Sequence, residues 1–163
     1  MTDTTFDPSL RADDLPTPAL IEHILQRYHE PHRAALADLM RLAARVESVH
    51  DDASAGLSRI LEALRAELES HMAKEENVLF PMMLNGGHPM IGAPINVMRH
   101  EHDEAAALIE TLRARTGGFA LPAEACCSWT RLYTGLDRLA TDLVEHIRLE
   151  NEVLFPRFES AAA

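Results

Sequence analysis

The sequence has few aromatic residues and few basic residues, and each shortage excludes a class of protein. Aromatic side chains make up 5% of the 163 residues although 47% are hydrophobic, which favours helices rich in Ala and Leu over sheets. The chain has 15 Lys and Arg against 26 Asp and Glu, a formal net charge of -11. Such an acidic chain has no general attraction for phosphate backbones, so we expect no nucleic-acid partner.

Cysteine and long apolar runs are scarce as well. The two cysteines, Cys126 and Cys127, are adjacent, which is not a disulfide framework and indicates a reducing compartment. We expect both thiols to be buried and inert, with redox sensing as the alternative. No apolar stretch approaches the roughly 18 residues of a membrane span, and the first twenty residues show no secretory signal. We therefore expect a cytoplasmic protein with no membrane partner.

Helical periodicity is what the sequence does have. We expect residues 1–16, rich in Asp, Thr and Pro, to form a flexible arm, and residues 17–159 to form one domain. Gly- and Pro-rich turns divide that domain into helices over 17–49, 57–84, 94–116 and 122–158. Pro31 should kink or break the first helix, and Gly135 should weaken the last. Four long helices with short connections indicate an all-α, antiparallel up-down-up-down four-helix bundle.

One phrase occurs twice, as HMAKEENVLFP from His71 and as HIRLENEVLFP from His146. In each copy a glutamate, Glu75 or Glu150, follows the histidine by four residues and so shares its helix face. A single His-x3-Glu is weak evidence, because surface ion pairs at that spacing are common. Two copies at corresponding places in two helical hairpins indicate an internal duplication and paired metal ligands.

The other two helices offer further histidines. RYHEPH supplies His29 or His32, and RHEHDE supplies His100 or His102. His29 precedes the first motif histidine by 42 residues, and His102 precedes the second by 44. In an antiparallel bundle these intervals bring all four imidazoles to about one depth, so we choose His29 and His102. His50 lies about 30 Å along the helix from His29 and belongs at the opposite end, unless Pro31 folds the chain back sharply.

These histidines and glutamates predict a two-metal site. Each ion takes two imidazoles, the two glutamates bridge the ions, and about two positions stay open for small molecules. The absence of cysteine excludes a zinc-finger type, and imidazoles with bridging carboxylates favour iron. The paired Glu-x-x-His motifs of ferritin-like sites are missing. The predicted ligands are His29, His71, Glu75, His102, His146 and Glu150.

The ligand set, with the segments RYHEPHR, SHMAKEENVLFP, EHDEA, EACCSW and LVEHIRLENEVLFPR, resembles the hemerythrin-like domain over residues 17–159. It is most similar to the RIC (YtfE/ScdA-type) iron–sulfur cluster repair proteins. The resemblance implies two non-haem iron ions, oxo- or hydroxo-bridged, and a role in nitrosative and oxidative stress. Binding or reduction of NO, O2 or peroxide is implied, with damaged iron–sulfur proteins and an electron donor as partners.

Two departures limit the resemblance. Oxygen-carrying hemerythrins have five histidines and a different spacing in the last motif, whereas both motifs here place Glu at i+4. Repair proteins of this type also carry a small N-terminal domain with a vicinal Cys pair, and the 16 residues before the first expected helix contain no Cys. A reversible O2-binding or sensing module without catalysis is the alternative function, and a metal-bearing structural bundle is a third.

For the remaining polar and apolar residues of these segments we expect roles other than metal binding. His32 is expected to be either a donor behind a ligand or a surface residue. We expect solvated side chains at His23, Glu76, His88, Glu101 and Glu152. For Glu101, tuning of the metal site is the alternative. We expect a further set of residues to lie in the core, where they close one end of the bundle, fill gaps or support the helices. These residues are Met72, 78–80, Met82, Met83, Met98, Trp129 and 153–155.

Overall fold

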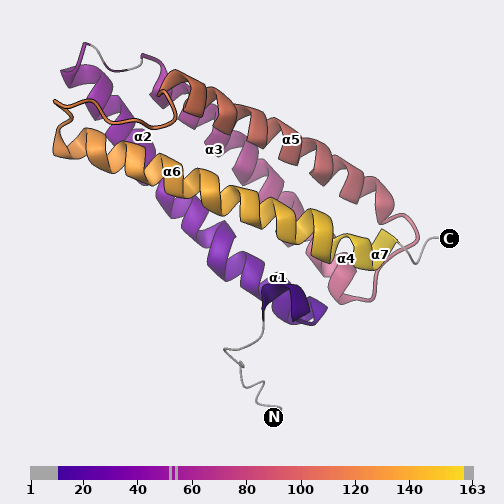
Figure 1. The fold of residues 1–163 in the computed structure, drawn as a ribbon. Helices are drawn as coiled ribbons and strands as arrows, with labels where there is room; N and C mark the ends of the chain where they lie inside the picture. The colour runs from indigo at the N-terminus through magenta and orange to yellow at the C-terminus, as the bar shows by residue number, and fades with distance from the viewer. Residues whose placement is uncertain (1–10, 52, 54, 160–163) are drawn as a thin grey trace.

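The computed structural model describes residues 11–51, 53 and 55–159. Four long helical segments run antiparallel and lie side by side (Figure 1). Neighbouring contacts run from α2 to α3, from α3 to α5, from α5 to α6 and from α6 back to α2. The predicted all-α, up-down-up-down bundle is therefore confirmed.

Each long segment except the third is divided into shorter elements. The first contains α1 (Thr17–Ile24), η2 (Leu25–His29) and α2 (Glu30–Val49), preceded by the short η1 (Ala12–Asp14). The second contains α3 (Leu57–Lys74), η3 (Glu75–Leu79) and α4 (Phe80–Leu84). The third is α5 (Gly92–Arg115), and the fourth contains α6 (Cys127–Arg148), η4 (Leu149–Leu154) and α7 (Pro156–Glu159).

The elements η2, η3 and η4 are π-helical turns, and each ends two residues before a proline. Proline lacks an N–H group and its ring clashes with the carbonyl four residues back, so the helix is rearranged just upstream. The residue before each proline donates its N–H to the carbonyl five residues earlier: Glu30 to Leu25, Phe80 to Glu75 and Phe155 to Glu150. The break predicted at Pro31 thus takes the form of a π turn, a feature often found at functional sites.

Two helices begin elsewhere than predicted. The third begins at Gly92 rather than at residue 94, and the fourth begins at Cys127 rather than at residue 122. At the second position the Ala125 N–H bonds to the Pro122 carbonyl at 3.1 Å, which closes a turn before the helix. Cys126 has extended backbone angles (φ -75°, ψ 167°) and stands as the N-cap of α6. Cys126 therefore precedes the helix, and Cys127 is its first residue.

The interior consists of two apolar clusters separated by a polar layer. The larger cluster fills the bundle along α2, α3, α5 and α6, and the smaller one lies at the end formed by α1, α4 and α7. In every long segment, buried histidines or glutamates fall between residues of the two clusters. We call this set the histidine–glutamate layer; its members are His29, His32, His71, Glu75, His102, His146 and Glu150.

Part of the described chain before α1 contacts the rest of the bundle. Leu15 is buried in the smaller apolar cluster, and Arg148 donates to the Asp13 carboxylate at 2.6 Å. Arg157 also donates to the Leu15 carbonyl at 2.9 Å. Asp13 and Leu15, which fall in the segment predicted to be a flexible arm, therefore contact the last helical segment, while residues 1–10 lie outside the described residues.

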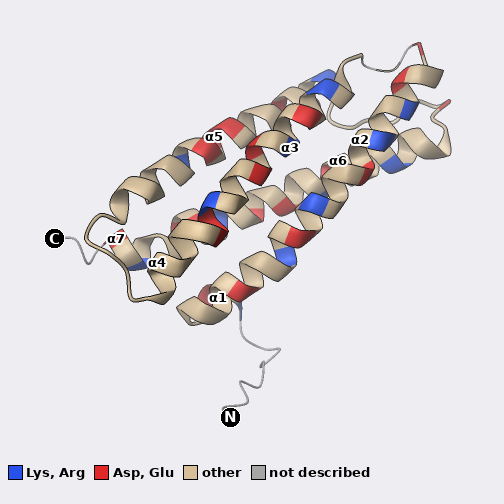
Figure 2. Cartoon of the chain, turned by 180° about the vertical axis from the view of Figure 1, so that it is seen from behind, with Lys and Arg blue, Asp and Glu red and all other residues tan. Residues whose placement is uncertain are grey.

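Gly135, predicted as a weak point, is a point of close helix contact. A Cβ atom at this position would lie 2.6 Å from Leu39 Cδ2, so the α2 side chain fills the space above α6. On the outside, Lys and Arg are interspersed with Asp and Glu along α2, α3 and α5 (Figure 2). Within the described residues, none of the helices combines the length and apolarity needed to cross a bilayer.

Candidate metal centre

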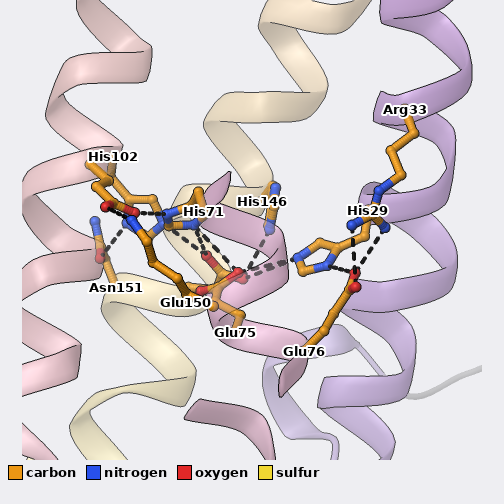
Figure 3. Close-up of polar contacts among 11 residues, drawn as sticks. His29, Arg33, His71, Glu75, Glu76, His102, His146, Glu150 and Asn151 are labelled. Atoms are coloured by element: carbon orange, nitrogen blue, oxygen red, sulfur yellow. Dashed lines mark hydrogen bonds and ion pairs between the residues drawn. The ribbon is translucent and has the colours of Figure 1, made fainter. Parts of the chain in front are cut away.

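The structure brings all six predicted ligands into the histidine–glutamate layer (Figure 3). His71, His102 and His146 project from α3, α5 and α6, whereas His29, Glu75 and Glu150 lie on π turns. Their ligand atoms form two overlapping groups, and within each group the atoms lie within 4.8 Å of one another. One group joins His29 and His146, the other joins His71 and His102, and both contain Glu75 and Glu150.

Each glutamate touches one imidazole of each group. Glu150 Oε1 lies 2.9 Å from His146 Nε2, and its Oε2 lies 2.9 Å from His102 Nε2. Glu75 Oε2 lies 3.3 Å from the Nε2 atoms of both His29 and His71. The two carboxylates, which come from different hairpins, therefore stand between the groups, as bridging ligands would.

The electrostatics of the layer favour buried positive charge. Both glutamates are completely buried, and neither Glu75 oxygen has a hydrogen-bond partner among the described residues. Burial opposes charge on His29, yet Glu150 and Glu75 raise its pKa to about 9. Burial likewise opposes charge on His71, but the same glutamates raise its pKa to about 11. Carboxylates that stabilise imidazolium so strongly can equally stabilise metal cations, so the donor set fits a metal centre.

The histidines in turn stabilise the charged form of the Glu150 carboxyl group. Burial raises the pKa of its carboxyl, but the charge of His146 and hydrogen bonds from His102, His146 and His29 lower it well below its ordinary value. The carboxylate therefore stays ionised although no water reaches it, which is the form that a bridging ligand needs.

Glu76 was predicted to be solvated, and this is wrong. Its Oε1 accepts from His29 Nδ1 at 2.9 Å, and Arg33 donates to the same oxygen at 2.8 Å. The positive charge of Arg33 holds the carboxylate in place, and the carboxylate holds the imidazole ring. Because Nδ1 carries the proton in this bond, Nε2 is the ring atom that faces the layer and that could hold a metal ion.

Two more side chains hold imidazoles in the same way. Glu101 Oε2 accepts from His71 Nδ1 at 3.1 Å, and its other oxygen pairs with Lys74, so its predicted solvated position is also wrong. Asn151, for which the sequence led to no prediction, accepts from His102 Nδ1 at 3.0 Å. A signal for it existed: Glu76 and Asn151 each directly follow the glutamate of a repeated motif.

His146 is held differently. Its Nδ1 is buried and has no hydrogen-bond partner in the described part of the chain. Tyr28 stacks on its ring at a centroid distance of 5.3 Å, and the His32 ring also lies 5.3 Å away. Of the two predicted positions for His32, the surface one is wrong, since the residue is 2% exposed. Burial, followed by the charge of His146, lowers the pKa of His32 to about 3, so its ring stays neutral.

The histidines that were set aside lie away from the layer. The His100 side chain is 75% exposed and pairs with Glu104, and His88 is exposed, as predicted. His23 is half-buried, where solvation was expected. His50 caps the far end of α2 and contacts Cys126.

The repeated apolar runs close the layer on the side of the smaller cluster. Phe80 stacks on His29 at a centroid distance of 5.8 Å, and Phe155 stacks on His102 at 6.0 Å. The prediction is wrong for Val78, which is 51% exposed because it lies on the outer face of the π turn η3. Most of the other expected core residues are buried: Met72, Leu79, Met83, Met98, Trp129 and Leu154. Met82 and Val153 are half-buried.

The two cysteines are not both buried. Cys126 is half-buried and Cys127 is exposed, so the prediction of buried, inert thiols is wrong. The cause is their position at the start of α6, where the chain leaves a turn at the end of the bundle. Glu152, by contrast, is exposed, as predicted.

Comparisons with known proteins agree with this geometry. A protein-family model described as the hemerythrin HHE cation binding domain matches residues 20–158. The iron-sulfur cluster repair protein YtfE of Escherichia coli O1:K1 / APEC is 46% identical over 145 residues, and so is that of Escherichia fergusonii. Each alignment covers 87% of this chain and 66% of the relative. The chain therefore spans just under two thirds of the length of these relatives.

Proposed function

The chain belongs to the hemerythrin HHE cation binding domain family, and from this premise we propose that its histidine–glutamate layer binds two iron ions. The observation that carries the proposal is the pair of overlapping ligand groups that share two fully buried carboxylates. One ion would bind His29 and His146, the other would bind His71 and His102. Imidazole and carboxylate donors without thiolate suit a pair of iron ions.

We further propose that this centre serves defence against nitrosative and oxidative stress in the cytoplasm. It would bind or reduce NO, O2 or peroxide and assist the repair of iron–sulfur clusters, with damaged iron–sulfur proteins and an electron donor as partners. The support is the 46% identity with relatives named for iron–sulfur cluster repair. When bound, paired iron supplies open coordination positions and electrons for small molecules.

The protein's own contribution would be to orient the ligands and exclude water. Glu76, Glu101 and Asn151 each fix one imidazole through Nδ1. Such partners behind the ligands set ring orientation and ligand basicity, and their loss typically weakens metal binding about 10–100-fold. Phe80 and Phe155 cover the layer with apolar surface, which limits water access and influences the redox potential.

Metal analysis of matched variants tests the ligand assignment. Protein produced in iron-supplemented medium should contain about two irons per chain. His102→Ala and Glu150→Ala should lose iron, whereas the neighbouring exposed residues give the controls His100→Ala and Glu152→Ala, which should keep it. A full iron complement in Glu150→Ala would overturn the bridging role, and zinc in place of iron would favour a structural bundle.

Absorption spectroscopy of the reduced protein separates the two gas-binding functions. Rapid oxidation in air and a new spectrum with NO are expected if the centre transfers electrons to small molecules. A stable oxygenated species that releases O2 under vacuum would instead identify a reversible O2-binding module. Repair activity is then tested by adding the iron-loaded protein to an iron–sulfur enzyme damaged by NO and measuring the recovery of its activity, with Glu150→Ala as the inactive control.

A further inference from the structure

A second group of reactive side chains lies at the end of the bundle opposite the smaller apolar cluster. Cys126 precedes α6 and His50 follows α2, and His50 Nε2 lies 3.2 Å from Cys126 Sγ. Both side chains line a cavity of about 380 Å³. Its remaining walls are formed by Arg45, Val46, Val49, Cys127 and Ser128. This site shares no residue with the histidine–glutamate layer.

The surroundings of Cys126 favour its thiolate form. Backbone N–H groups of Trp129 and Ser128 and the imidazole of His50 all hydrogen-bond to the sulfur and lower the pKa of the thiol, the Trp129 bond contributing most. The thiolate is the nucleophilic form of cysteine, and a neighbouring histidine is a common means of activating it. Cys127 is exposed, whereas Cys126 is half-buried, so the two adjacent thiols have different surroundings.

The size and lining of the cavity indicate which kind of molecule could reach the thiolate. A volume of about 380 Å³ falls in the range of pockets that bind small organic molecules, and it far exceeds what peroxide would need. Arg45 and His50 supply the basic groups of the wall, and Val46 and Val49 supply apolar surface. The wall therefore suits a small organic molecule that carries a carboxylate.

We propose that Cys126 is a thiol–disulfide exchange site for a small, carboxylate-bearing disulfide, with His50 as its proton acceptor and Arg45 as the carboxylate-binding group. His50 accepts the proton of the Cys126 thiol, and the thiolate attacks one sulfur of the disulfide. The S–S bond of the small molecule breaks as a new S–S bond to Cys126 forms. The departing half leaves as a thiolate and recovers the proton from His50, so atoms, electrons and protons balance. This inference does not depend on the bound metal or on the proposed function.

Intact-mass spectrometry of the full chain with glutathione disulfide as the probe tests the proposal. Cys127→Ser retains only Cys126, and Cys126→Ser retains only Cys127, so the two proteins form a matched pair. At pH 7 the Cys126 thiol should form a mixed disulfide about threefold faster or more, although it is the less exposed of the two. The ratio should fall as the pH rises and both thiols ionise. Faster reaction of Cys127 at every pH would overturn the proposal.

Two further substitutions in the Cys127→Ser background separate the roles of the cavity residues. His50→Gln should slow the reaction at pH 7 and leave it nearly unchanged at high pH, where the thiol ionises unaided. Arg45→Ala should slow exchange with glutathione disulfide but not with the uncharged hydroxyethyl disulfide. Circular dichroism on heating shows that each variant is folded. If folded His50→Gln reacts at the unchanged rate at pH 7, His50 does not activate Cys126 and the site is not as proposed.

Discussion

Phe80→Ala should destabilise the protein strongly because it leaves a cavity in the apolar core beside the histidine–glutamate layer. The ring is 2% exposed, belongs to the smaller apolar cluster and stacks on His29 at a centroid distance of 5.8 Å. Removing a buried phenyl ring costs about 3–5 kcal/mol, because apolar burial is lost and a cavity remains. In a domain of this size, a loss of about 1 kcal/mol in the free energy of unfolding lowers the melting temperature by about 2–4 °C. The melting temperature of Phe80→Ala should therefore fall by about 6–20 °C.

The assay is thermal unfolding followed by circular dichroism, with a chelator present so that metal binding adds nothing to stability. Val78→Ala is the matched control, because Val78 lies two residues earlier in the same repeated run but is 51% exposed. Its loss should change stability by no more than about 0.5 kcal/mol. Equal melting temperatures for Phe80→Ala and Val78→Ala would show that the end of the bundle is not packed around Phe80.

Three further predictions concern different parts of the molecule. Glu76→Gln should weaken iron binding about 10–100-fold, since His29 loses a charged acceptor, and a competition titration with a chelator measures the change. Asp13→Asn should remove stability that is present above the ordinary pKa of an aspartate and lost in acid, because the hydrogen bond from Arg148 lowers the pKa of Asp13. The unfolding free energies of wild type and variant should therefore converge as the pH falls through that lowered pKa, and urea unfolding at a series of pH values from 7 downward measures both. His50→Ala should leave the iron content unchanged, as elemental analysis will show, because His50 lies at the other end of the bundle.

The sequence contained the information for the bundle and for the position of the layer. Periodicity and turn residues predict four helices, and the 42- and 44-residue intervals predict that the imidazoles share one depth. The structure places them so because antiparallel helices of similar length keep their register. The start of α6 was harder to predict, since Pro122 can open either a helix or the turn that the structure shows.

The side chains behind the ligands could not be assigned from one helix at a time. Glu76 and Glu101 each adjoin a layer residue in the sequence, so on an isolated helix they point about 100° away from it. The structure shows that this direction faces an imidazole on a neighbouring helix, His29 for Glu76 and His71 for Glu101. Such pairings depend on how the helices are rotated against each other. The π turns, in contrast, lie just before Pro31, Pro81 and Pro156, a regularity that the sequence displays.

An anomalous difference map recorded at the iron absorption edge on crystals of the iron-loaded protein would give the number and the positions of the bound ions. If the layer binds paired iron, the map will contain two peaks about 3.5–4 Å apart in the histidine–glutamate layer. One peak should lie beside His29 and His146, and the other beside His71 and His102, with a carboxylate of Glu75 and of Glu150 between them. A single peak, or iron bound outside this layer, would contradict the paired site.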